Sequence, residues 1–191
     1  HGEYVTHAKD LPAALERDPL KLAQFHAEVR FARQVAHPNV CRVYDIGETD
    51  GHVFLSMEYI DGEDLSAVLR RMGRPTEDKA VEIARQVALG LAAAHEAGML
   101  HRDLKPSNIL IDRRGQPHVS DFGLAKQFAA DESFTRSGAV LGTPSYMPPE
   151  QAAGQRGKLS PASDVYSLGA ILYQMLTGRP PFQAASPVET V

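Results

Sequence analysis

Residues 100–110, LHRDLKPSNIL, place polar and charged side chains between two apolar flanks. Asp103 and Asn108 lie five positions apart, and Asp121 follows thirteen positions after Asn108, beyond a β-like run. An amide oxygen and a carboxylate oxygen that meet from neighbouring loops are hard ligands of the kind that Mg²⁺ takes, with water and phosphate completing its shell. Asp103 then stays available as a base for a hydroxyl, and Lys105 can neutralise a transferring phosphoryl group. This set predicts phosphoryl transfer, because that reaction asks mainly for positioning and electrostatic stabilisation.

The bulk composition is that of an ordinary globular chain. Its 191 residues are 43% hydrophobic and 23% charged, with a formal net charge of −4, which argues against binding to a nucleic-acid backbone as the main role. The single cysteine, Cys41, allows no internal disulfide; we interpret it as a core residue and expect a reducing, cytoplasmic location. The longest apolar stretch, residues 165–176, is too short to span a bilayer. We therefore expect no membrane segment in this chain, and leave open an anchor elsewhere in the protein.

The elements before residue 60 are expected to be rich in strands. A short strand is predicted over residues 3–11, and a hairpin over residues 40–60 is predicted to turn at Asp50-Gly51. Between them, Asp18 and Pro19 begin a helix that we expect to reach residue 36. Its buried stripe is predicted to comprise Leu22, Phe25, Val29 and Ala36.

The elements after residue 60 are expected to be mainly helical. The DGEDL segment at 61–65 is predicted to be a loop that leads into a short helix, and Thr76 is predicted to cap a long helix that ends near Gly98. Residues 162–177 are apolar nearly all round, which predicts a helix buried at the centre of this part. The buried stripe of the long helix is predicted to comprise Ala80, Ile83, Val87, Leu91 and Ala94. Together these elements predict an α+β, two-lobed molecule with a small lobe at 1–60, a large lobe at 61–191 and a cleft between them.

Three motifs make the chain resemble the eukaryotic-type protein kinase family. HRDLKPSN at 101–108 resembles the family's catalytic loop, DFG at 121–123 its metal motif, and PPE at 148–150 its A-P-E signature. HPNVCRVYDIGE at 37–48 and GTPSYMPPEQ at 142–151 are similar to the bacterial, eukaryote-like Ser/Thr kinases. The resemblance covers essentially the whole chain, and it implies the two-lobed kinase fold, truncated at both ends, with ATP and Mg²⁺ (or Mn²⁺) as cofactors and proteins as substrates.

The resemblance implies a role for each residue of the opening set. Asp103 resembles the catalytic base and Lys105 the lysine that contacts the γ-phosphate of ATP. Asn108 and Asp121 resemble the two metal ligands. Thr143 resembles the threonine that braces Asp103 and Lys105, and together with Lys105 it favours Ser/Thr over Tyr acceptors.

The nucleotide site is implied by the residues of the small lobe. Glu28 resembles the helix glutamate that pairs with a strand lysine, and Lys9, nineteen positions earlier, is the expected partner. Met57 resembles the gatekeeper residue at the back of the adenine pocket. The backbone groups of Glu58 and Ile60 are expected to meet the adenine edge.

A regulatory set is also implied. Arg102 resembles the arginine that senses phosphorylation of the following segment, and Thr135 and Ser137 stand where bacterial kinases of this type carry activating phosphates. Lys126 is expected to help Arg102 bind such a phosphate. The alternative is a solvated loop in which Ser and Thr serve as turn residues. Asp164, in SDVYSLG, resembles the aspartate that braces the catalytic loop, and a helix-capping role is compatible with that.

The sequence departs from the family in ways that affect the expected activity. Only eight residues precede Lys9, so the glycine-rich phosphate-binding loop is absent, and His7 stands where a small residue is usual. Pro148 replaces the alanine of A-P-E. We expect the chain to be part of a kinase domain with weak or no activity alone. The alternatives are a pseudokinase or binding scaffold, and a small-molecule phosphotransferase of related fold.

Overall fold

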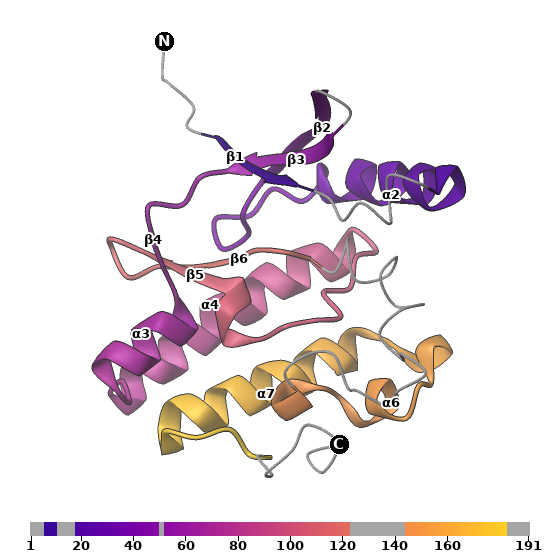
Figure 1. Cartoon of the computed structure of the whole chain (residues 1–191). Helices are drawn as coiled ribbons and strands as arrows, with labels where there is room; N and C mark the ends of the chain where they lie inside the picture. Colours follow the sequence, from indigo (N-terminus) through magenta and orange to yellow (C-terminus); the bar gives the residue numbers. More distant parts are fainter. Residues whose placement is uncertain (1–5, 11–17, 50–51, 123–143, 183–191) are drawn as a thin grey trace.

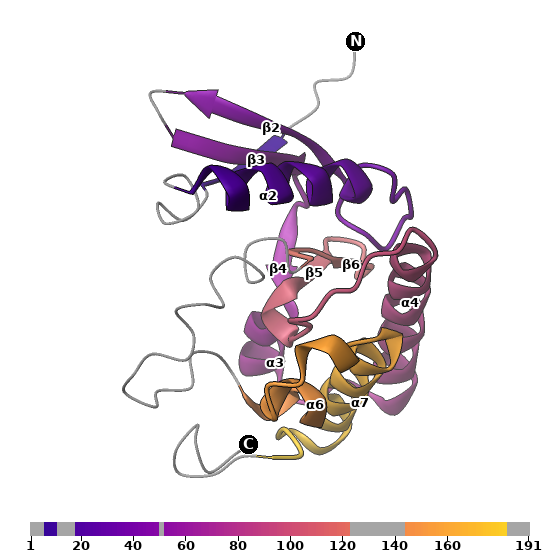
Figure 2. The same cartoon turned by 90° about the vertical axis from the view of Figure 1, so that its right-hand side faces the viewer.

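The computed structural model describes residues 6–10, 18–49, 52–122 and 144–182. A small antiparallel sheet and one helix make up the upper part of the molecule, and a second small sheet and the remaining helices make up the lower part (Figures 1 and 2). The chain passes from one part to the other after residue 58, between the two sheets. This is the expected α+β, two-lobed arrangement, whereas the boundary near residue 60 stays a prediction.

The upper sheet has the strand order β1-β3-β2. It contains β1 (Thr6–Asp10), β2 (Val43–Thr49) and β3 (His52–Glu58). Strand β3 alternates between buried and partly exposed positions, and the buried side chains, which all lie on one face as strand geometry requires, are Val53, Leu55 and Met57. The expected hairpin is therefore confirmed, while its turn at residues 50–51 lies outside the described residues.

Helix α2 (Pro19–Ala32) lies along this sheet (Figure 2). Phe25 and Val29 are buried as expected, but the helix ends at Ala32, four residues earlier than predicted. The two turns that follow are closed by hydrogen bonds between residues three positions apart, such as Val35 N donating to Ala32 O at 3.2 Å. The predicted burial of Ala36 is wrong, because the early end turns Ala36 outward.

The long helix of the lower part is α4 (Glu77–Glu96). Its first turn is capped by Thr76, whose hydroxyl oxygen accepts from Lys79 N, and it ends just before Gly98, which has a φ of 77°. All five residues of the predicted stripe are buried. The prediction of this helix is confirmed in its ends and in its buried face.

Helix α7 (Pro161–Thr177) packs against α4. Ser160 caps it, and Gly178, in the left-handed conformation at φ 86°, ends it. The prediction of burial on nearly all sides is wrong. One face is buried, but apolar side chains on the outer face are 39–62% exposed, and these are Val165, Tyr173 and Leu176.

The second sheet contains a strand that the sequence did not predict. Its order is β4-β5-β6, with β4 (Gly62–Asp64), β5 (Ile109–Asp112) and β6 (Pro117–Val119). Strand β4 falls in the segment expected to be a loop. A Cβ at Gly62 would lie 2.0 Å from the carbonyl oxygen of Ile111, so only glycine allows this close pairing. Asp64 then caps α3 (Leu65–Met72) by accepting from Ala67 N at 2.9 Å.

The two parts of the molecule are also tied by backbone bonds beside the second sheet. Val40 forms a parallel bridge with Val119. Cys41 N donates to Val119 O at 2.9 Å, and Val119 N donates to Asn39 O at 2.8 Å. These bonds fix the segment before β2 against the end of β6, from which the 120–122 segment enters the site. Within the described residues, we find no helix with the length and apolar character needed to cross a membrane.

Candidate active site

The 101–103 segment is held by a buried carboxylate. Asp164, on α7, is 1% exposed. Its Oδ2 accepts from His101 N at 2.8 Å, and its Oδ1 accepts from Arg102 N at 2.9 Å. Arg102 has a φ of 63°, a conformation that non-glycine residues rarely adopt. Asp164 therefore stabilises a strained turn directly before Asp103.

A residue that sequence reasoning missed shares this carboxylate. His95, in the last turn of α4, lies with its Nε2 2.8 Å from Oδ2 of Asp164. The available signal was a histidine six positions before His101, just where the long helix ends. That signal does not predict the contact, because the partner, Asp164, is 69 positions further along the chain.

His101 connects this turn to the segment that carries Asp121. Its Nε2 lies 2.9 Å from Ser120 O, and its ring lies 4.9 Å from that of Phe122. Asp103 N donates to Nδ1 of His101 at 3.3 Å. These contacts require a proton on Nε2 and none on Nδ1, which is the neutral imidazole. Burial agrees with this state, since it disfavours the charged form and lowers the pKa of His101.

The buried, neutral His101 predicts a loss of stability in acid. In the unfolded chain a histidine has a pKa of about 6.5, so below that pH the unfolded state binds a proton that folded His101 does not. The free energy of unfolding should therefore fall as the pH drops through about 6.5, by at most roughly 1.4 kcal/mol per pH unit. Urea unfolding at pH 7.5 and pH 5.5 should show a larger loss for the wild type than for His101→Phe.

Exposed His26 offers the matched control for that measurement. His26→Phe should keep the wild-type pH dependence. If His101→Phe kept it as well, His101 would not be the group responsible.

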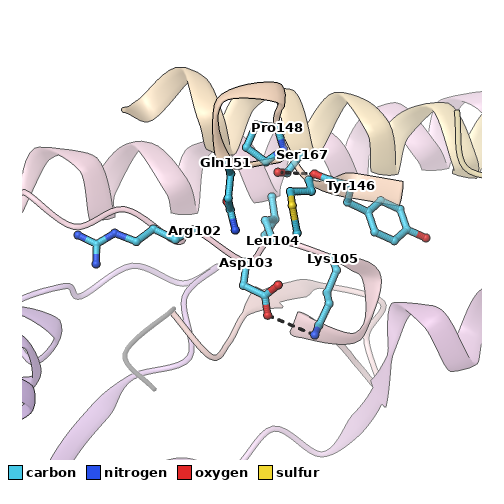
Figure 3. A pocket seen from close by; sticks show the side chains of 9 residues that line it. Arg102, Asp103, Leu104, Lys105, Tyr146, Pro148, Gln151 and Ser167 are labelled. Carbon is cyan, nitrogen blue, oxygen red and sulfur yellow. Dashed lines mark hydrogen bonds and ion pairs between the residues drawn. The ribbon is translucent and has the colours of Figure 1, made fainter. Parts of the chain in front are cut away.

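The side chains of Asp103 and Lys105 lie next to each other directly after this turn (Figure 3). Lys105 Nζ lies 3.2 Å from Asp103 Oδ2, and the two side chains are 24% and 18% exposed. Both groups are therefore fixed near each other while remaining reachable from outside. The carboxylate can accept a proton from a hydroxyl, and the ammonium group can neutralise an incoming anionic group.

Asn108 lies at the end of the same loop, at the start of β5. Its Nδ2 donates to Asp103 O at 2.9 Å, which directs the amide nitrogen inward and makes Oδ1 the atom suited to bind a cation. Its carbonyl oxygen accepts from Ser120 N at 2.9 Å. Because Asp121 directly follows Ser120, this bond brings Asp121 beside Asn108. Asp121 has a φ of 56°, a second strained backbone position in the site.

The Asn108–Asp121 pair fits a cation that takes few protein ligands. The described residues contain no group of three or more His, Cys, Asp or Glu side chains that could hold a metal ion. An amide oxygen and a carboxylate are hard donors, as Mg²⁺ prefers, and Mg²⁺ commonly completes its shell with water and phosphate. A divalent cation at this pair would therefore complete its shell with oxygens of water or of a phosphorylated substrate.

Glu28 pairs across the two parts of the molecule with Arg102. Its Oε1 lies 3.7 Å from Arg102 Nη1, and the side chains are 26% and 33% exposed. Burial raises the pKa of Glu28, and Arg102 opposes that shift. The expected partner Lys9 has its backbone opposite Leu55 in the sheet, but its side chain lies outside the described part, so the Lys9–Glu28 pair stays a prediction.

The region expected to bind adenine has Met57 buried behind it, at 6% exposure. Glu58 N donates to Arg42 O at 2.8 Å, and Glu58 O accepts from Cys41 Sγ at 3.1 Å. Burial, with smaller effects of nearby carboxylates, raises the pKa of Cys41 to about 12, which keeps it a thiol. Ile60 packs against the core. The roles of these residues toward a nucleotide stay predictions.

Four residues of the predicted site lie outside the described part of the chain: Lys126, Thr135, Ser137 and Thr143.

Glu150 of the PPE motif lies within the described part of the chain. It accepts a short hydrogen bond from the hydroxyl group of Ser163, at the start of α7, and this bond lowers the pKa of Glu150. The PPE segment is thereby attached to the helix that carries Asp164.

Comparison with known proteins agrees with this geometry. Residues 7–190 match the family model described as "Protein kinase domain". The chain is 43% identical over 188 residues to the serine/threonine-protein kinase pkn3 of Myxococcus xanthus, and 40% identical over 184 residues to PknB of Mycobacterium leprae. It is 39% identical over 184 residues to PknH of Mycobacterium bovis. These alignments cover 94%, 94% and 96% of this chain, but 34%, 29% and 30% of the relatives. The chain belongs to the protein kinase domain family.

Proposed function

We propose that the natural protein containing this chain is an ATP-dependent protein serine/threonine kinase. One observation carries the proposal. Asp103 and Lys105 lie on one loop with Asp103 Oδ2 and Lys105 Nζ 3.2 Å apart, and this loop ends at Asn108, which lies next to Asp121. All the relatives named above are called serine/threonine-protein kinases, which supports the same activity.

In the proposed reaction Asp103 accepts the proton of a substrate hydroxyl as its oxygen forms a bond to the γ-phosphorus of ATP. The bond from that phosphorus to the β–γ bridging oxygen breaks, and ADP leaves. Lys105 stabilises the charge of the transferred group. Asn108 and Asp121 hold a divalent cation, proposed to be Mg²⁺, which when bound neutralises the phosphates.

Protein serine and threonine residues are the proposed acceptors. Lys105 is present where the family's Ser/Thr enzymes carry a lysine, and Thr143 is proposed to brace it. A scaffold without catalysis is not favoured, because Asp103, Asn108 and Asp121 are all present.

The change Asp121→Ala tests the metal part of this proposal. In the full-length natural protein, ATP affinity at millimolar Mg²⁺ should fall by about tenfold or more, since a metal that clamps phosphates contributes several kcal/mol. Affinity without Mg²⁺ should change little. Fluorescent-nucleotide titration with and without Mg²⁺ measures both. Exposed Asp78, on α4, supplies the control variant Asp78→Ala, and an unchanged Mg²⁺ dependence in Asp121→Ala would contradict the assignment.

A further inference from the structure

Ser120 joins the two segments that carry the cation-binding pair, Asn108 and Asp121. It is 5% exposed and directly precedes Asp121. Both of its donors reach one atom, because Ser120 N donates to Asn108 O at 2.9 Å and Ser120 Oγ donates to the same oxygen at 3.3 Å. Its own carbonyl oxygen accepts from Nε2 of His101 at 2.9 Å. All three polar groups of Ser120 therefore bond to the 101–108 loop.

These bonds place Asp121 relative to Asn108. The peptide unit is planar, so the bond from His101 to Ser120 O also fixes the nitrogen and Cα of Asp121. Asp121 has a φ of 56°, a conformation that persists only where the surroundings hold it. On the other side, Asn108 is 6% exposed and its Nδ2 donates to Asp103 O at 2.9 Å. Both residues of the pair are thus held by their neighbours without help from a cation.

The hydroxyl group is the part of Ser120 that belongs to its side chain. Any residue at this position supplies the backbone N–H and C=O, but an alanine would leave Asn108 O with one donor in place of two. The second donor resists a shift of one segment along the other. A simpler interpretation is that a buried hydroxyl group takes the nearest acceptor and contributes to stability alone. The two interpretations differ in what they predict for cation binding.

Divalent cations differ in how strictly they need this spacing. Mg²⁺ demands near-octahedral geometry with oxygens at about 2.0–2.1 Å, whereas Ca²⁺ accepts flexible geometry at about 2.3–2.6 Å. A small shift between Asn108 and Asp121 should therefore weaken Mg²⁺ more than Ca²⁺. We propose that Ser120 is a positioning residue whose hydroxyl group holds Asn108 and Asp121 at the spacing that favours Mg²⁺ over larger divalent cations. The inference rests on the proposed function, in which this pair holds the cation.

The test removes the hydroxyl group in Ser120→Ala, in the full-length natural protein. The affinity for a fluorescent ATP analogue is measured without divalent cations, at millimolar Mg²⁺ and at millimolar Ca²⁺. The gain in affinity that Mg²⁺ produces should fall about twofold to tenfold, the range that one hydrogen bond contributes. The gain from Ca²⁺ should fall by a smaller factor, and the affinity without cations should stay unchanged.

Three further variants serve as controls, and thermal melting checks that each is folded. Ser120→Thr keeps the hydroxyl group and should keep the wild-type gains. Ser120→Cys replaces it by a weaker donor and should give a Mg²⁺ gain between those of the wild type and Ser120→Ala. It also carries the test if Ser120→Ala does not fold. Ser66→Ala, at a half-buried serine on α3, should change none of these affinities.

Several outcomes would overturn the inference. An unchanged Mg²⁺ gain in Ser120→Ala would show that the hydroxyl group only satisfies a buried acceptor. Equal losses with Mg²⁺ and Ca²⁺, or an equal loss without cations, would show a general defect of the nucleotide site. The same loss in Ser120→Thr would trace the effect to packing. If the wild type gained no affinity from either cation, the proposed cation site itself would fail, a result seen before any variant is made.

Discussion

Asp103→Asn should lower kcat for phosphate transfer by about 10²–10⁴-fold, the contribution typical of a positioned general base. Asparagine has nearly the same shape as aspartate but cannot accept the hydroxyl proton. It also loses the charge that holds Lys105 Nζ at 3.2 Å, so both partners of the pair are disturbed. Nucleotide affinity should stay close to that of the wild type, because Asp103 acts on the acceptor.

The measurement combines steady-state transfer to a peptide with fluorescent-nucleotide titration of the same protein. Asp78→Asn, at an exposed position on α4, provides the control for a change from aspartate to asparagine as such. Near-wild-type turnover in Asp103→Asn would remove Asp103 from the proposed role. A matching loss of nucleotide binding would point to a folding defect.

Asp164→Ala should have the largest effect on stability. The change leaves the backbone N–H groups of His101 and Arg102 without their acceptor, and it also removes the partner of His95. At roughly 1–3 kcal/mol for each unpaired buried group, the two N–H groups alone predict a loss of about 2–6 kcal/mol in the free energy of unfolding. Turnover should fall as well, because the turn before Asp103 is no longer held.

Urea unfolding followed by circular dichroism, alongside turnover, would measure both effects. Asp164→Asn keeps one carbonyl oxygen, so its loss should be smaller than that of Asp164→Ala. Equal stability of Asp164→Ala and the wild type would show that the buried carboxylate does not hold the loop.

Local signals made the helices predictable. The helix over Glu77–Glu96 has a hydroxyl cap at Thr76, acidic residues in its first turn and an apolar residue at each turn, and all of these act within a few positions of one another. The hairpin of β2 and β3 was predictable for the same reason, since its two strands are adjacent in the sequence.

The missed features depend on partners far along the chain. Strand β4 exists because β5, more than 40 residues later, supplies its hydrogen bonds, whereas its own residues, Gly-Glu-Asp, disfavour strands. His95 became visible only through Asp164. Apolar periodicity likewise did not indicate that α2 ends at Ala32 or that one face of α7 is exposed.

The catalytic set was predictable in its members but not in all of its contacts. Asp103, Lys105 and Asn108 share one loop, so their spacing alone placed them together. The pairing of Glu28 with Arg102 was not foreseen, because it joins the two parts of the molecule through side chains 74 positions apart.

The most direct test of the proposed function is transfer of ³²P from γ-labelled ATP by the full-length natural protein, followed by acid hydrolysis of the labelled products. We expect label in phosphoserine or phosphothreonine of a protein substrate, dependent on a divalent cation and lost in Asp103→Asn. Label only in a small molecule, label only in phosphotyrosine, or no transfer at all would contradict it.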